Sequence, residues 1–77
     1  MRPLCEIAKE ITTDWKNPYF GSVPYIRAMY TMNSIDDKYF LDSGREIVAR
    51  FLGNAQTWKG ETARRVKVEL NKMLKNK

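Results

Sequence analysis

The spacing of apolar residues along the chain predicts four helices. Apolar side chains recur every three or four residues over about 3–15, 22–32, 43–53 and 57–74, the period that collects them on one face of an α-helix. The second segment is apolar on nearly all sides, which is typical of a central helix. We therefore expect an all-α fold, a compact single-domain bundle of about four short helices over residues 1–77.

Two of these helices carry clear end signals. Pro3 suits the first helical position, because the N–H group that proline lacks would have no partner there. Ser43 and Glu46 match the capping box, so the third helix should begin beside Ser43. Gly53 and Asn54 can end that helix in a left-handed conformation.

The start of the last helix is open. Thr57 is a candidate N-cap, which would place Trp58 and Lys59 in the first turn. Gly60 weakens that turn. The alternative is a last helix that begins only at Gly60 and a third helix that runs on to Trp58.

Residues 33–42 are the least regular part of the chain. Ser34 could cap a single turn that contains Asp37. The stretch 39–41, Tyr-Phe-Leu, then supplies an apolar patch. We expect a turn followed by a loop.

Two pairs of side chains allow two interpretations each. Tyr19 and Phe20, between the first two helices, either plug the gap between helices or form an exposed recognition pair. Met29 and Met32 either fill the core or form the adaptable binding surface that methionines can provide.

The excess positive charge lies entirely in the last quarter of the chain. Residues 1–58 contain seven basic and seven acidic residues, whereas residues 59–77 contain seven basic residues and two acidic ones. The net charge of +5 therefore belongs to the stretch from Lys59 to Lys77. This asymmetry favours a polyanionic partner or an acidic protein surface; the alternative is a solvated helix face followed by a basic tail.

The residue types that most enzymes use are missing. The chain has no histidine, so the commonest general base is absent, and Cys5 is its only cysteine. Neither a Cys/His zinc site nor an intramolecular disulfide can form. Asp36, Asp37 and Asp42 lack the spacing of a calcium loop, and the four glycines are too scattered for a phosphate-binding loop. We expect a non-enzymatic protein with no catalytic residues, metal or cofactor.

The sequence also favours a cytoplasmic protein. A single cysteine fits a reducing compartment. Residues 1–6 lack the apolar run of a signal peptide, and no stretch approaches the ~20 apolar residues that cross a bilayer. We expect no membrane partner.

The last helix carries the best candidate for a partner-binding surface. Its basic residues occupy the arc opposite the apolar face of the helix. Val68 lies among them, and an apolar residue flanked by cations favours a contact surface over a purely solvated one. The candidate partner-binding residues are Arg64, Arg65, Lys67, Val68, Lys72 and Lys75. Additional candidate contacts are Tyr19, Phe20, Tyr39 and Lys59.

The last two helices also match a helix-turn-helix in their expected lengths. In that arrangement residues 54–57 would join them. The second helix would then enter the major groove, with Trp58, Lys59, Arg64 and Arg65 in its first turns. The basic arc would serve equally well to contact phosphates without reading the base sequence.

Four stretches of the sequence carry a resemblance to known proteins. They are Glu6–Ile11, Asp14–Phe20, Val23–Met29 and Phe51–Gly60, and the similarity spans nearly the whole chain. Together they resemble a family of short proteins encoded by phages and conjugative elements of Gram-positive bacteria. The resemblance implies an accessory gene of a mobile element, cytoplasmic in a bacterial host. Small non-enzymatic proteins in that setting are often inhibitors of host defence, such as anti-CRISPR proteins, or small transcriptional regulators.

These observations lead to one expected function and one alternative. We expect a phage or mobile-element protein that binds and inhibits a host defence protein, such as a nuclease. The alternative is a small helix-turn-helix-like regulator that binds nucleic acid through its basic last helix.

Overall fold

The apolar stripes fold into helices around one core. The structure, a computed structural model, describes residues 2–75, and in that range it has four α-helices, one 3₁₀ helix and one two-stranded antiparallel sheet. In chain order the elements are α1 (Leu4–Asp14), η1 (Phe20–Ser22), α2 (Val23–Tyr30), β1 (Lys38–Tyr39), β2 (Asp42–Ser43), α3 (Gly44–Gly53) and α4 (Glu61–Lys75). The mostly helical bundle is confirmed, and the small sheet corrects the all-α expectation.

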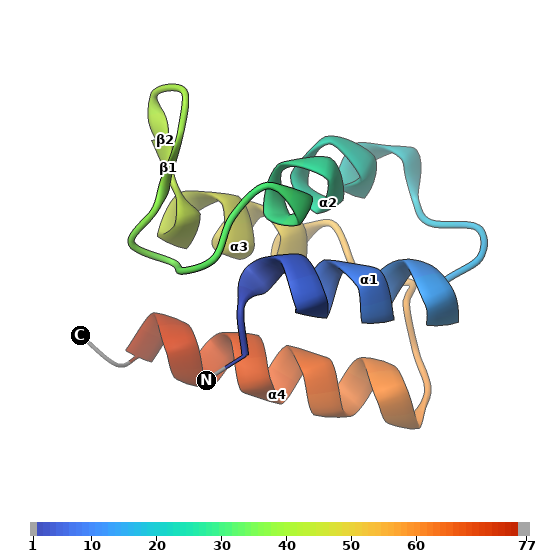
Figure 1. The fold of residues 1–77 in the computed structure, drawn as a ribbon. Helices are drawn as coiled ribbons and strands as arrows, with labels where there is room; N and C mark the ends of the chain where they lie inside the picture. The colour runs from blue at the N-terminus through green and yellow to red at the C-terminus, as the bar shows by residue number, and fades with distance from the viewer. Residues whose placement is uncertain (1, 76–77) are drawn as a thin grey trace.

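The helices form a ring in which each packs mainly against two others. α1 contacts α2 and α4, and α3 contacts the same two helices. In Figure 1, α4 runs along the lower edge of the molecule, and the β1–β2 hairpin projects upward beside the start of α3. The hairpin and α4 therefore lie on opposite sides of the domain.

Three aromatic rings at the centre of the core join segments that are far apart in the sequence. Trp15, just after α1, stacks on Trp58 with ring centroids 5.7 Å apart. Phe51 of α3 meets both rings edge-on, at 6.4 and 6.3 Å. The Trp58 indole N–H donates to Asp14 Oδ2 at 2.8 Å. Although Trp58 lies in a loop, it is only 2% exposed, because this cluster encloses it.

The first two helices differ slightly from their expected ends. Pro3 is the residue that precedes α1, with extended backbone, and does not occupy the first helical position. α2 ends at Tyr30, two residues before Met32. Met29 and Met32 are both buried, so these methionines fill the core.

In residues 33–43 the expected turn is present, but a hairpin takes the place of the expected loop. Ser34 caps the turn: its Oγ accepts from the Asp36 N–H and its backbone carbonyl accepts from the Asp37 N–H, both at 3.0 Å. The Asp37 carboxylate accepts from the backbone N–H groups of Asn33 and Ser34, at 2.8 and 3.2 Å. The hairpin follows, with Lys38 opposite Ser43, Tyr39 opposite Asp42, and a two-residue connection at 40–41. This hairpin is not predictable from its turn residues, because Phe-Leu lacks the Asn or Gly that marks two-residue hairpin turns.

Contact with α3 holds this segment in place. Gly44 N–H donates to Asp37 O at 2.7 Å, and Arg45 N–H donates to Ile35 O at 3.0 Å. A Cβ atom on Gly44 would meet the backbone of Ile35 at 2.7–2.8 Å, so only glycine allows this approach. The hairpin is thus fixed by a close approach between backbones.

The ends of the last two helices settle the open alternatives. The capping box is confirmed: Glu46 N–H donates to Ser43 Oγ, and Ser43 N–H donates to the Glu46 carboxylate. α3 ends at Gly53, as expected, but Asn54 has a φ of −105° and is not left-handed. α4 begins at Glu61, beside the later of the two candidate starts, and α3 does not reach Trp58. Burial of Trp58 explains both results, because the chain must leave the helix to place this ring in the core.

The two glycines of α3, Gly44 and Gly53, give a matched test of the contact between Gly44 and the Ile35 backbone. We expect Gly44→Ala to destabilise the fold by about 1–3 kcal/mol, because the Ile35 backbone cannot move aside cheaply. In Gly53→Ala the added Cβ would have no atom within 4 Å. This variant should therefore be more stable than the wild type by a few tenths to about 1 kcal/mol. Urea unfolding of both variants measures the difference. Equal stability of G44A and the wild type would contradict the described contact.

Candidate binding surface on the last helix

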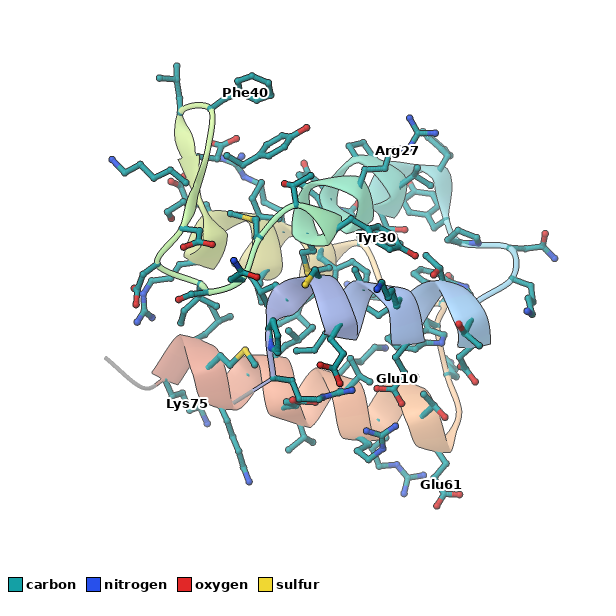
Figure 2. All side chains as sticks on the ribbon, in the orientation of Figure 1. Glu10, Arg27, Tyr30, Phe40, Glu61 and Lys75 are labelled. Carbon is teal, nitrogen blue, oxygen red and sulfur yellow. The ribbon has the colours of Figure 1, made fainter. Side chains whose placement is uncertain are left out.

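The outer side of α4 presents most of the predicted binding residues to solvent. Arg64, Val68, Lys72 and Lys75 are exposed, and the Val68 residue is 49% exposed to solvent. The opposite side of the helix is buried through Ala63, Val66, Leu70 and Met73. Figure 2 shows Glu61 and Lys75 at the two ends of this helix. The core therefore fixes the orientation in which the cations face outward.

Arg65 belongs to an ion-pair network with the first helix. It contacts the Glu10 carboxylate, which also lies 2.8 Å from Arg2 Nη2. Arg2 in turn binds Glu69 of α4 with two hydrogen bonds, of 3.0 and 2.6 Å. Two arginines and two glutamates thus neutralise one another, and this edge of α4 carries little net charge.

The network lowers the pKa of the Glu10 carboxyl below its usual value. The contact with Arg65 is the main cause, partial burial opposes it, and Arg2 adds to the lowering. Ionised Glu10 therefore stabilises the folded chain.

Lys67 faces a different environment on the other edge of α4. Its amine donates to the backbone carbonyl of Trp58 at 2.6 Å and lies 6.0 Å from the centre of the Trp58 ring. Burial, and then the neighbouring charge of Lys59, lower the pKa of this amine. Lys67 is thus tied to the loop that precedes α4.

Three of the candidate cations gather around one hollow at this edge. The hollow has a volume of about 310 Å³ and is lined by Trp58, Lys59, Gly60, Ala63, Arg64 and Lys67. Lys59 had been expected only as an additional contact. The structure places Lys59 beside Arg64 and Lys67, two of the main candidates.

The remaining cations of the outer face are uncompensated. Within residues 2–75, Arg64, Lys72 and Lys75 have no acidic partner within ion-pair distance. We call these three residues, together with Val68, the basic face. Lys77, the last basic residue of the sequence, lies outside the described residues. The basic face is therefore the part of α4 that is free to attract a partner.

The aromatic candidates lie elsewhere on the surface. Tyr19 and Phe20 are exposed, with ring centroids 4.8 Å apart, so the expectation that they plug a gap between helices is wrong. Tyr39 is half-buried in the hairpin and rests against Phe40.

The structure differs from the expected helix-turn-helix. Seven residues, 54–60, separate α3 from α4, where such motifs use three or four. Trp58 is buried before the helix begins and cannot serve as a groove side chain. Arg64 and Arg65 do lie in the first turns of α4, but Arg65 is paired with Glu10.

The most exposed apolar side chains were not among the binding candidates named from the sequence. Phe40 and Leu41, at the hairpin tip, are 85% and 97% exposed. The sequence marked 39–41 as an apolar patch but nominated only Tyr39. Which of the three residues points outward depends on the hairpin, which the sequence did not predict.

Searches for a metal site, a membrane span and known relatives add no assignment. Among residues 2–75, no three His, Cys, Asp or Glu side chains are grouped as a metal ion would require. In the same range no helix has the length and apolar character of a bilayer span. No family model, curated protein or solved structure matches the chain.

The ion-pair network should make stability depend on acid pH. Because the pKa of Glu10 is lower when folded, its contribution is present above the pKa of a free glutamate, ~4.3, and is lost as the pH falls through the folded value. We expect the wild type to lose stability more steeply than Glu10→Gln between about pH 5 and pH 3. Urea unfolding across this range measures the slopes.

Glu6→Gln is the matched control, since Glu6 is an exposed carboxylate of the same helix. It should retain the slope of the wild type. Identical slopes for the wild type and E10Q would show that the network contributes nothing.

Proposed function

We propose that this chain is a non-enzymatic accessory protein of a phage or mobile element, and that it binds and inhibits a host defence protein, as anti-CRISPR proteins do. The observation that carries the proposal is the basic face, where Arg64, Lys72 and Lys75 surround the half-exposed Val68. Uncompensated cations attract an acidic surface over a distance, and Val68 offers apolar area that contact would bury. The resemblance to short proteins of phages and conjugative elements supports the bacterial setting.

The geometry of the basic face suits a pre-formed contact. Arg64, Val68 and Lys72 follow one another at intervals of four residues, and Lys75 follows at three. On an α-helix these side chains form one stripe about 16 Å long. The helix is already held by its buried side, so binding would order only the tips of the exposed side chains.

An acidic protein surface fits this stripe better than a phosphate backbone does. Phosphate contacts use cations and gain nothing from the apolar Val68 between them. Protein interfaces combine an apolar centre with a polar rim. Glu61 is exposed at the start of the same helix, where it would repel phosphates.

Protection of a phage from an RNA-guided nuclease tests the proposal. In a Gram-positive host that carries such a nuclease, expression of the chain should let a targeted phage form plaques. Arg64→Glu combined with Lys72→Glu should remove this protection, because the loss of two contacts of about 1 kcal/mol each weakens binding about 30-fold. Plaque counts and binding to the purified nuclease measure the effect.

The matched control reverses two exposed cations elsewhere. Lys16→Glu with Arg27→Glu produces the same net charge, and Arg27 lies on α2, away from α4 in Figure 2. It should protect the phage as the wild type does. Full protection by R64E/K72E would refute the basic face as the surface. Failure of the wild type to protect against any RNA-guided nuclease of the host would refute this form of inhibition.

Nucleic-acid binding is the second candidate, and the hollow beside α4 favours it. Lys59, Arg64 and Lys67 converge there, and Lys59 already lowers the pKa of Lys67. A phosphate in the hollow would relieve that repulsion. Anisotropy of labelled DNA and RNA distinguishes this candidate, since three phosphate contacts predict about 40-fold weaker binding at ~200 mM than at ~50 mM salt. A folded chain that binds neither at ~50 mM salt would exclude it.

A further inference from the structure

The hairpin tip is the most exposed apolar part of the described chain. Phe40 and Leu41 form the two-residue connection between β1 and β2, and they are 85% and 97% exposed. Figure 2 shows Phe40 at the far end of the hairpin, away from the helices. Neither side chain belongs to the core cluster or packs against it. The core therefore gains nothing from their apolar surface.

The backbone at the tip is strained as well. Among the described residues other than glycine, Phe40 alone has a positive φ, 57°. Two-residue hairpin turns with a positive φ at the first central position normally use glycine there. A bulky ring at this position costs stability, and such strain is commonly found where a site needs it. Two unfavourable features, strain and exposure, thus occur at one residue.

The hairpin nevertheless holds the tip in one place. The Tyr39 ring is half-buried against the core and lies 4.7 Å, centre to centre, from the Phe40 ring in an edge-on contact. Behind it, Gly44 and Ile35 fix the hairpin to α3. A protruding apolar pair on a fixed support loses little conformational freedom when it is buried by a partner.

The charges around the hairpin select the class of partner. The flanking acids are paired with nearby arginines: Asp36 with Arg45 at 3.8 Å, and Asp42 with Arg50 at 3.3 Å. Residues 36–50 contain four acidic and three basic residues, so this side has no positive excess. Nucleic acids and anionic lipid surfaces attract basic regions. A rim of paired charges with no positive excess, around an apolar tip, matches an apolar pocket on a protein.

We propose that Phe40 and Leu41 anchor the chain in an apolar pocket of a protein partner. The anchor rests on the proposed function only in that the partner is a protein. Figure 1 shows the hairpin on the opposite side of the domain from α4, the helix that carries the basic face. The two surfaces can therefore be tested separately.

The test first identifies the protein at the tip and then measures its binding. The chain with p-benzoylphenylalanine in place of Phe40 is expressed in the bacterial host and irradiated. The same replacement of Tyr30, which is 39% exposed on α2 and belongs to neither proposed surface, is the matched control. A protein that crosslinks from position 40 but not from position 30 is purified. Its Kd is then measured for the wild type, F40G, L41S, Y30S and R64E/K72E.

We expect F40G and L41S each to bind this protein about 100-fold more weakly, as the loss of one fully buried large side chain implies. Y30S should bind as the wild type does. F40G should also unfold at a higher temperature than the wild type, because glycine relieves the positive φ. Weaker binding by a more stable variant cannot result from unfolding.

Several results would overturn the anchor. One is wild-type affinity of F40G and L41S, and another is an F40G variant less stable than the wild type. Crosslinks from position 40 that reach only nucleic acid, lipid or a second copy of the chain would also overturn it. If R64E/K72E loses binding while F40G and L41S retain it, the anchor fails and the proposed function stands. The reverse pattern supports the anchor and refutes the basic face.

Discussion

The stack of Trp15 on Trp58 is the contact on which the positions of the other elements depend. It joins the end of α1 to the loop before α4, and the hydrogen bond from Trp58 to Asp14 fixes the ring in one orientation. Phe51 connects the same pair to α3. The backbone carbonyl of Trp58 then accepts from Lys67, which ties α4 to the loop. The basic face is presented at a defined angle because this buried tryptophan holds the helix.

Pairing of charges, more than their number, defines the surface of α4. Arg65 and Glu69 are neutralised by Glu10 and Arg2, whereas the cations of the basic face have no acidic partner in the described range. The helix thus has a structural edge that holds α1 and an outer face that is free for binding. The hairpin tip provides a second exposed feature on the other side, apolar and nearly neutral. A rigid core with two such surfaces suits a protein that acts by binding.

Local signals in the sequence predicted what local interactions determine. The capping box of Ser43 and Glu46 and the apolar stripes of the helices involve residues within a few positions of one another, and they were found as expected. The hairpin was missed because it depends on Gly44 approaching the backbone of Ile35, a contact that no periodicity records. The pairing of Arg65 with Glu10 was not predicted for a similar reason: the two residues are 55 positions apart in the sequence.

Mapping the contact surface in solution tests the central claim, that the chain works through the basic face and the hairpin tip. Amide NMR spectra of the labelled chain are compared with and without the protein that crosslinks from position 40. We expect changes at residues 38–43 and along the exposed positions of 64–75, with the core side of α1 unchanged. Changes confined to the loop around Tyr19 and Phe20, with the basic face and the tip unaffected, would contradict this claim.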